Sequence, residues 1–198
     1  MILEGIVTTL SSSGEMHVAP MGPRVEPAMD RFLLRPFPSS QTYQNLRRDG
    51  EGVFHVTDDV LLLAQAAVGR IDPPPPHFPA AQVKASVLAE ACRFYEFRVS
   101  AIDDREQRVR IDVDVVHSGR LRDFIGFNRA KHAVVEAAIL ATRIDILPHS
   151  EIVADYRRLA VLVEKTGGPR EIEAFSFLEA YLDEVMRSRA ENASKERA

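Results

Sequence analysis

The sequence predicts an α+β protein, in which a barrel of short antiparallel strands precedes a helical C-terminal section. Two observations carry this prediction. Up to about residue 118, short apolar and β-branched runs, several of them alternating with polar residues, are separated by glycine- and proline-containing turns. From residue 128 onward, apolar residues recur instead at the spacing of an α-helix, about 3.6 residues per turn. Many short strands joined by turns favour a barrel over a parallel sheet.

The composition fits a folded protein of 198 residues with 45% hydrophobic residues and a net charge of −4. That charge argues against a nucleic-acid-binding protein, and no stretch approaches the roughly 20 apolar residues of a membrane span. The single cysteine, Cys92, lies in an apolar stretch and is expected to be buried. Since the six histidines show no ligand spacing, no metal site is predicted. Without a recognisable signal peptide, the chain is expected to be a soluble cytoplasmic protein.

The first half of the chain reads mainly as strands. They are predicted at residues 2–10, 16–21, 31–35, 52–57, 93–103 and 108–118. A turn on Gly14 joins the first two strands into a hairpin. The last strand alternates most clearly, with Val109, Ile111, Val113 and Val115 on one face.

Helices interrupt the strands and then replace them. Short helices are predicted at residues 41–48 and 60–67, and the proline-rich segment 72–79 is predicted to be a loop. Longer helices are predicted at residues 128–147, 151–164 and 171–186. We therefore expect a barrel domain over residues 1–125, a helical section over 126–190 packed on the barrel, and a disordered tail over 191–198.

Several catalytic signatures are missing. The sequence contains no G-x-G-x-x-G, no G-x-x-x-x-G-K-[ST], no H-E-x-x-H and no G-x-S-x-G. These absences argue against a classical nicotinamide dehydrogenase, a P-loop enzyme, a zinc protease of that class and an α/β-hydrolase. No general acid or base can be assigned, so the catalytic residues are unknown. His17 and His55 are candidates by location, although a structural histidine in a strand is the commoner case.

The segment from Arg35 to Asn45, which reads RPFPSSQTYQN, is the most informative stretch. Two prolines end an extended run, and hydroxyl side chains stand where a helix begins. Unpaired N–H groups and the positive end of the helix dipole attract a phosphate at such a position. Two interpretations remain open here. Ser39 or Ser40 caps a short helix, or the hydroxyls cradle a phosphate with Arg35 as the counter-charge.

The order of these features resembles the FMN-binding split barrel of flavin reductases and pyridoxamine-phosphate-oxidase-like proteins. The matching stretches are GIVTTLSSSGEMHVAPMG, then RFLLRPFPSSQTYQNL, then FHVTDD. Within that superfamily the chain is similar to the DUF447 family across nearly its full length. The late segments GFNRAKHAVVEAAILATRIDIL and EKTGG carry this second likeness.

This resemblance implies an FMN-binding homodimer with the flavin ring near the subunit interface. The FMN phosphate would be held by four residues: Ser39, Ser40, Gln41 and Thr42. Asn45 would support that loop. The ring or its ribityl chain would be approached by Met21 and Gly22, and the ring edge by backbone groups of His55, Val56 and Thr57.

The start of the long helix, Asn128, Arg129 and Lys131, also has two interpretations. Either these residues cap the helix and form a solvated basic face, or they make polar contacts to the phosphate or to a second substrate. Two basic residues at a helix N-terminus are mildly unfavourable for the dipole, which points to a nearby anion.

The function predicted from these features is that of an FMN-dependent oxidoreductase, flavin reductase-like, with unknown substrate. NAD(P)H or a pterin-related small molecule is the candidate partner. Two alternatives remain open: a non-catalytic flavin-binding or sensing module on the same fold, and a protein whose helices bind a partner.

Overall fold

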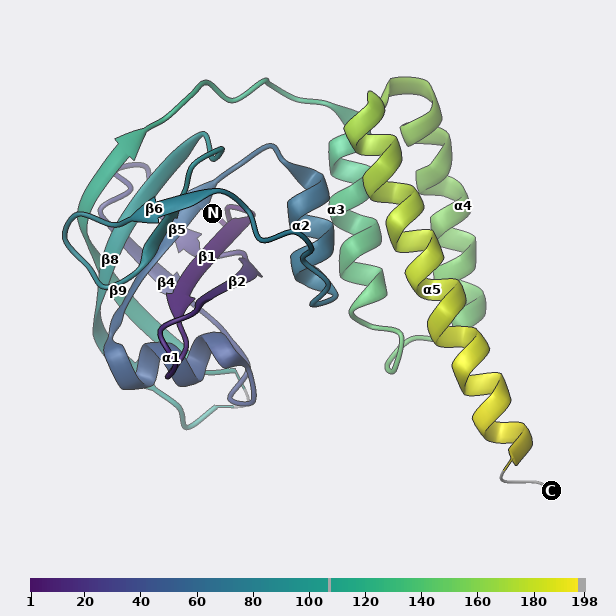
Figure 1. Cartoon of the computed structure of the whole chain (residues 1–198), viewed down its shortest axis with the longest axis horizontal. Coiled ribbons are helices and arrows are strands. Elements are labelled where there is room, and N and C mark those ends of the chain that lie inside the picture. The colour runs from purple at the N-terminus through teal and green to yellow at the C-terminus, as the bar shows by residue number, and fades with distance from the viewer. Residues whose placement is uncertain (107, 196–198) are drawn as a thin grey trace. The chain divides into compact units, whose positions relative to one another are not determined.

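The computed structural model describes residues 1–106 and 108–195 (Figure 1). The chain divides into two compact units. The barrel unit comprises Met1–Asp58 and Asp72–Ile125, and the helical unit comprises Asp59–Ile71 and Gly126–Ala198. The division expected from the sequence also falls after residue 125, but it assigns residues 59–71 to the first domain. In the structure these residues pack with the later helices.

The barrel unit is built on one curled antiparallel sheet of seven strands, in the order β2-β1-β5-β8-β9-β4-β3 (Figure 1). The strands are β1 Gly5–Leu10, β2 Met16–Met21, β3 Arg24–Val25, β4 Arg31–Leu34, β5 Glu51–Val56, β8 Arg93–Asp103 and β9 Arg110–Arg120. Within the described residues the sheet ends on β2 and β3, so the barrel is split rather than closed. The predicted α+β class, with an antiparallel split barrel followed by helices, is confirmed.

The concave side of the sheet holds the core of the barrel unit. The rings of Phe32, Phe54 and Tyr95 meet there, with the Phe32 centroid 5.5 Å from that of Phe54 and 5.6 Å from that of Tyr95. Edge-to-face contacts of this kind are favourable beyond the area that they bury. Val109 and Ile111 are fully buried beside them, which confirms the face predicted from their alternation.

The predicted loop at residues 72–79 is wrong for its last three residues. His77–Pro79 forms β6, which pairs with β7, Ser86–Leu88, in a separate two-stranded sheet. A proline is tolerated there because Pro79 lies at the end of an edge strand, where the missing N–H removes no ladder bond.

The helical unit contains α2 Val60–Ala67, α3 Arg129–Ala141, α4 His149–Thr166 and α5 Pro169–Lys195. Small residues of α3, among them Ala133 and Ala137, are almost fully buried against the other helices. Short side chains let neighbouring helix backbones approach closely, which explains the alanine-rich sequence of α3. No helix among the described residues is both long and apolar enough to cross a membrane.

Two helix boundaries differ from those predicted. The helix predicted to reach residue 147 ends at Ala141, although Ile144 beyond it is still buried. Pro148 follows and removes a backbone donor, so residues 142–148 turn instead. At the other end, α5 continues to Lys195, into the segment where disorder is expected. Residues 196–198 lie outside the described part of the chain.

Candidate phosphate site at the start of helix α1

Helix α1, Gln41–Asp49, begins directly after the two prolines that follow β4. Ser40 is its N-cap, with extended backbone angles of φ −74° and ψ 143°. The Ser40 hydroxyl accepts a hydrogen bond from the Tyr43 N–H over 3.2 Å and donates one to the Phe37 carbonyl over 2.8 Å. The capping interpretation therefore holds for Ser40, whose hydroxyl already donates one hydrogen bond and accepts another.

Other groups at the same helix start have no partner inside the helix. The N–H groups of Gln41 and Thr42 belong to the first turn, where no intrahelical acceptor exists. The first turn of α1 carries no acidic residue, and its last turn carries Arg47 and Arg48. Ser39 is exposed next to this turn. The end of α1 that faces the loop is thus a source of donors with no counter-charge on the helix itself.

Arg35 supplies a cation close by in sequence. Its terminal Nη2 lies 3.5 Å from a carboxylate oxygen of Glu106, at the limit of a hydrogen bond. Its Nε is buried and has no hydrogen-bond partner among the described residues. A buried N–H without an acceptor costs about 1–3 kcal/mol, so this donor is suited to an anion that the described residues do not provide.

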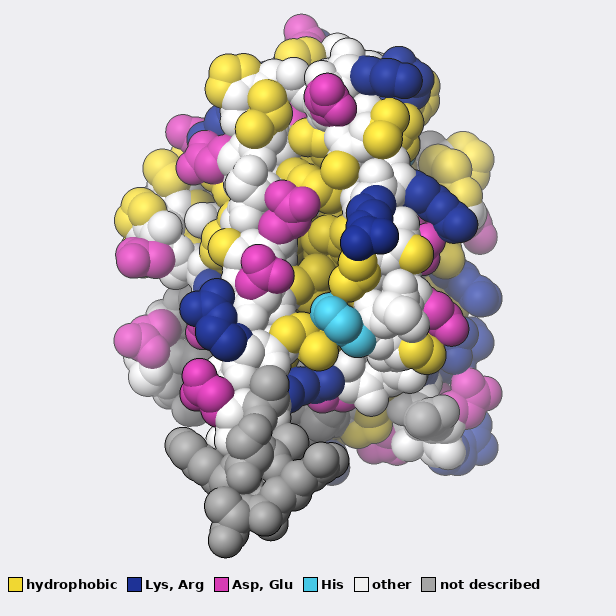
Figure 2. Space-filling view, turned by 90° about the vertical axis from the view of Figure 1, so that its right-hand side faces the viewer, with side chains coloured by type: hydrophobic (Ala, Val, Ile, Leu, Met, Phe, Trp, Pro, Cys, Tyr) yellow, Lys and Arg dark blue, Asp and Glu magenta, His cyan; other side chains and the backbone are white. Residues whose placement is uncertain are grey.

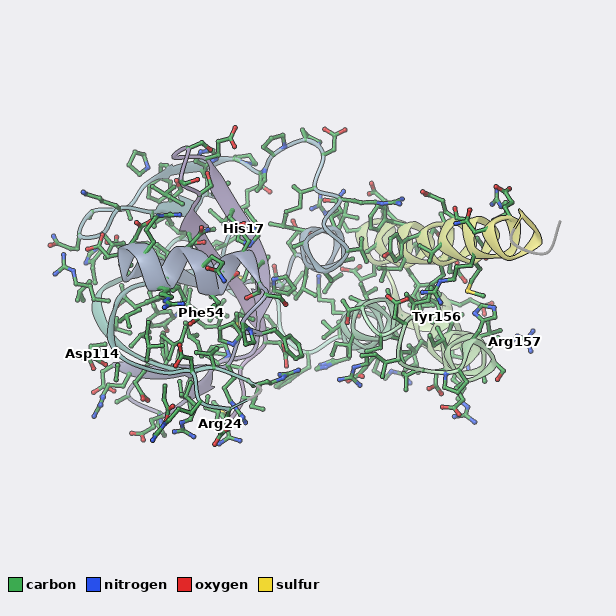
Figure 3. The ribbon with its side chains drawn as sticks, turned by 90° about the horizontal axis from the view of Figure 1, so that it is seen from below. His17, Arg24, Phe54, Asp114, Tyr156 and Arg157 are labelled. Carbon is green, nitrogen blue, oxygen red and sulfur yellow. The ribbon has the colours of Figure 1, made fainter. Side chains whose placement is uncertain are left out.

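A network of polar side chains fixes α1 to the first two strands. Gln41 Nε2 donates to Asn45 Oδ1 over 2.7 Å, and Asn45 Nδ2 donates to the Thr9 hydroxyl over 2.9 Å. Thr42 Oγ1 lies 3.3 Å from Nε2 of His17, which Figure 3 labels. Thr9 and His17 face each other across β1 and β2. Asn45 therefore docks the start of α1 onto β1, and its support of a phosphate-binding loop stays a prediction.

Partial burial lowers the pKa of His17 below the ordinary value of 6.5. The ring is therefore neutral near pH 7, where one nitrogen donates and the other accepts. A neutral ring at this distance can position the Thr42 hydroxyl, and it adds no charge to the helix start.

The residues predicted to reach the flavin ring lie on β2 and β5. Met21 ends β2, and a Cβ on Gly22 would lie 2.9 Å from Ile2 Cγ2, so this glycine permits a close approach within the chain. The Val56 carbonyl already accepts a hydrogen bond from the Cys92 N–H over 2.9 Å. Thr57 follows β5 directly. Their contact with a flavin stays a prediction.

His55 is fully buried and both of its ring nitrogens are occupied. Nδ1 donates to the Ile6 carbonyl over 3.2 Å, and Nε2 accepts from the Leu88 N–H over 3.0 Å. Burial lowers the pKa of His55 to about 4. Its side chain therefore connects β1, β5 and β7 as a neutral ring, and it has no free nitrogen for proton transfer.

Asn128, Arg129 and Lys131 belong to the helical unit, and two of them have structural partners there. Asn128 caps α3 and also donates to the Thr166 carbonyl over 2.9 Å. Lys131 Nζ lies 2.6 Å from a carboxylate oxygen of Glu171, with both side chains mostly buried. Arg129 is exposed. The capping interpretation is thus supported for Asn128, and Lys131 already has an anionic partner.

One buried polar cluster was not anticipated from the sequence. Asp58 is 8% exposed, forms an ion pair with Arg122 and accepts a hydrogen bond from the Ile125 N–H over 2.9 Å. Asp58, which follows β5, thus holds residues 122–125, the last residues of the barrel unit. The FHVTDD motif was the available signal, because an aspartate directly after a strand is well placed to accept backbone N–H groups.

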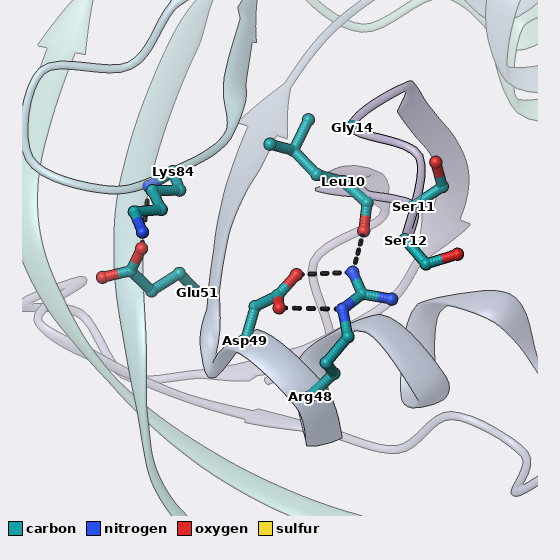
Figure 4. A pocket seen from close by; sticks show the side chains of 8 residues that line it. All are labelled: Leu10, Ser11, Ser12, Gly14, Arg48, Asp49, Glu51 and Lys84. Atoms are coloured by element: carbon teal, nitrogen blue, oxygen red, sulfur yellow. Dashed lines mark hydrogen bonds and ion pairs between the residues drawn. The ribbon is translucent and has the colours of Figure 1, made fainter.

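A hollow of about 530 Å³ opens beside the C-terminal end of α1 (Figure 4). It is lined by Leu10, Ser11, Ser12, Gly14, Arg48, Asp49, Glu51 and Lys84. Its charges are largely compensated within the chain, since Arg48 binds the Asp49 carboxylate and the Leu10 carbonyl. Its arginine is therefore already engaged, unlike the backbone donors at the start of α1.

Comparisons with known proteins agree with this fold. Residues 3–122 match the family model "Protein of unknown function (DUF447) N-terminal domain", and residues 128–180 match "Protein of unknown function (DUF447)". The chain belongs to the DUF447 family. The predicted family is therefore confirmed. No curated protein sequence matches this DUF447 chain.

Solved structures include a DUF447 protein with a similar fold. It is an FMN-bound protein from Methanosarcina mazei, with 23% sequence identity, a TM-score of 0.78, and coverage of 91% of this chain and 94% of that one. An NADH:FAD oxidoreductase from Streptomyces globisporus has 14% identity and a TM-score of 0.51, covering 60% of this chain and 70% of its own. An FMN-binding protein from Thermus thermophilus with bound 1-cyclohex-2-enone has 14% identity, a TM-score of 0.50 and the same coverage.

Proposed function

We propose that this DUF447 protein binds FMN and acts as a flavin-dependent oxidoreductase of the flavin reductase kind. The observation that carries the proposal is the start of α1, where backbone donors without an acceptor inside the helix lie next to the exposed Ser39. The buried Nε of Arg35, a few residues before the helix, has no acceptor among the described residues. The similarity to an FMN-bound DUF447 protein over 91% of the chain supports the same ligand.

The donor set fits a phosphate monoester. The backbone N–H groups of Gln41 and Thr42, the Ser39 hydroxyl and the Arg35 guanidinium would bind its oxygens. Ser40 would contribute by fixing the helix start rather than by direct contact, because its hydroxyl is engaged with Tyr43 and Phe37. A carboxylate in the first turn would repel the ligand, and α1 has none there.

A bound flavin would supply the electron-transfer chemistry, and the protein would hold and shield it. Met21 and Gly22 at the end of β2, and the β5 segment His55 to Thr57, are the proposed neighbours of the ring. His55 would stiffen this edge, since its ring ties β5 to β1 and β7. NAD(P)H is the proposed reductant, a pterin-related molecule is another candidate substrate, and a homodimer is the proposed assembly.

A second candidate function is flavin binding without catalysis. It is favoured by the environment of the two histidines near the proposed site. His55 has both nitrogens occupied, and the Nε2 of His17 lies against Thr42.

The visible spectrum of the purified protein tests flavin binding, and an NAD(P)H oxidation assay of the flavin-loaded protein tests catalysis. We expect a bound yellow chromophore that is released as FMN on denaturation, and sustained NAD(P)H turnover. Bound FMN without turnover would favour the binding module. Absence of the chromophore, together with no spectral change on adding FMN, would contradict both functions.

A further inference from the structure

The connection between β8 and β9 lies against the segment that leads into α1. The Val109 N–H donates a hydrogen bond to the Pro36 carbonyl over 3.1 Å. The guanidinium of Arg108 lies over the ring of Phe37, 4.3 Å from the ring centroid. The carbonyl of the same Phe37 accepts hydrogen bonds from the N–H and the hydroxyl of Ser40, the N-cap of α1. These contacts place Arg108 beside the proposed phosphate site.

The Arg108 guanidinium is held in place, yet its donors remain available. The side chain is exposed, and within residues 1–106 and 108–195 it forms no ion pair. A guanidinium that stacks on an aromatic ring uses its flat face, so the N–H groups in its plane can still bind an anion. The Phe37 ring, itself 49% exposed, therefore orients this cation without neutralising it.

Two other charged side chains of this connection are already engaged. Arg105 donates hydrogen bonds to both carboxylate oxygens of Asp103, over 2.8 and 2.6 Å. Asp104 accepts one from the Tyr43 hydroxyl over 3.1 Å, which also ties the connection to α1. Arg108 can thus bind an anion without giving up an acidic partner among the described residues.

Arg70 of the helical unit shows what a stacked arginine binds when an acid is present. It lies over the Tyr181 ring, 4.9 Å from the centroid, and donates to both carboxylate oxygens of Glu184 over 2.6 and 2.8 Å. On the face of this unit that Figure 2 shows, basic side chains likewise lie among acidic ones. At Arg108, no carboxylate of the described residues takes the place that Glu184 has at Arg70.

The charge of a phosphate monoester explains why a second cation belongs at this site. Such a group carries about −1.5 to −2 charges near pH 7. Arg35 supplies one positive charge, and the Glu106 carboxylate, 3.5 Å from its Nη2, offsets part of it. The start of α1 adds only the partial charge of the helix dipole. Arg108 is placed to supply the charge that Arg35 leaves uncompensated.

We infer that Arg108 determines specificity at the flavin site, and that it favours a terminal phosphate monoester, as in FMN, over the phosphate diester of FAD. This inference rests on the proposed flavin-binding function. A terminal phosphate has three free oxygens and up to two charges, so Arg35 and Arg108 can bind it from two sides. In FAD the same phosphate has two free oxygens and one charge, because the third oxygen links it to the next phosphate.

Isothermal titration of the full-length, flavin-free protein with FMN, FAD and riboflavin tests this inference. We expect the wild type to bind FMN about tenfold more tightly than FAD. Arg108→Gln should weaken FMN binding about tenfold, the usual size of one charge-assisted hydrogen bond, and should leave riboflavin binding unchanged. The preference for FMN over FAD is then lost. Phe37→Leu should reduce this preference by a smaller factor, because the charge stays but its orientation is lost.

Arg105→Gln is the matched control, since it removes the same charge from the same connection. It should leave all three affinities unchanged. Equal effects of Arg105→Gln and Arg108→Gln would overturn the inference, because they would assign the change to net charge.

Equal wild-type affinities for FMN and FAD would also overturn the inference, while leaving flavin binding intact. A wild type that binds none of the three flavins would contradict the proposed function and the inference together. If Arg108→Gln loses riboflavin binding as well, Arg108→Lys decides instead. Lysine keeps the charge without the planar donors, so the preference for FMN should fall, and an unchanged preference would reject the role of Arg108.

Discussion

Asn45 on α1 donates a hydrogen bond to the Thr9 hydroxyl on β1 over 2.9 Å, and neither side chain is more than 1% exposed. The same amide oxygen accepts from Gln41 at the start of the helix. The bond therefore connects the proposed phosphate site to the sheet, and it sets the position of the helix start on the barrel unit.

Replacing Asn45 by Ala should destabilise the protein by about 2 kcal/mol, since the change removes a buried hydrogen bond and leaves the Thr9 hydroxyl without its donor. Urea denaturation measures this loss. The double variant Asn45→Ala with Thr9→Val should lose less than the sum of the two single variants, because both partners are then apolar. Strict additivity would show that the two side chains do not interact.

The stability of the protein should depend on pH through His55. Its pKa in the folded protein is about 4, below the ordinary value of 6.5, because the buried ring resists charging. The unfolded chain therefore binds more protons than the folded one between these two values. The stabilisation is fully present above pH 6.5 and is lost as the pH falls towards 4, by on the order of 3 kcal/mol.

The control for this pH effect is His55→Gln, which keeps polar atoms in the buried site and does not titrate. Denaturant midpoints between pH 4 and 7 should fall steeply for the wild type and less steeply for the variant. Parallel curves would assign the acid sensitivity to other groups.

Removing the charge of Lys131 should strongly destabilise the helical unit. Burial alone would raise the pKa of Glu171, but hydrogen bonds from Lys131 and from the Gly168 N–H lower it overall. Lys131→Met would leave this carboxylate mostly buried without its cation, at a cost of about 3 kcal/mol. Thermal unfolding at pH 7 measures the effect. The variant Glu171→Gln in the Lys131→Met background should recover part of the loss, and failure to recover would indicate a packing effect.

Arg35 and Arg31 offer a matched pair on one segment for testing the phosphate site. Arg31 forms an exposed ion pair with Asp114, whereas the buried Nε of Arg35 has no acceptor among residues 1–106 and 108–195. Arg35→Gln should weaken FMN binding about 10- to 100-fold, the equivalent of one charge-assisted hydrogen bond of roughly 1.5–3 kcal/mol. Arg31→Gln should leave the affinity unchanged. Fluorescence quenching of FMN on binding gives both constants, and equal effects would reject the role of Arg35.

The sequence predicted those parts of the fold in which local pattern and tertiary structure agree. The alternation from Val109 to Val113 identified a buried face because a strand on one side of a core must alternate. The two-residue strand Arg24–Val25 was missed, since it lies between two prolines and forms only by pairing with β4. Apolar residues at helical spacing predicted a helix up to residue 147. Ile144 in this pattern is indeed buried, but the helix ends at Ala141 and Ile144 lies in the turn that follows.

The candidate site was predicted less completely, for a physical reason. Sequence can identify a helix start with hydroxyls, but it cannot tell which hydroxyl caps the helix and which remains available. Ser40 is the cap because its Oγ reaches both Tyr43 and Phe37. The partners of Lys131 and Asp58 are similarly distant in sequence, at Glu171 and Arg122, so only the fold reveals them.

The most direct test compares the affinities of the flavin-free protein for FMN and for riboflavin, which lacks only the phosphate. If the start of α1 holds the phosphate, FMN should bind at least tenfold more tightly than riboflavin, and Arg35→Gln should reduce that ratio. Equal affinities for the two flavins, or no binding of either, would contradict the proposed site.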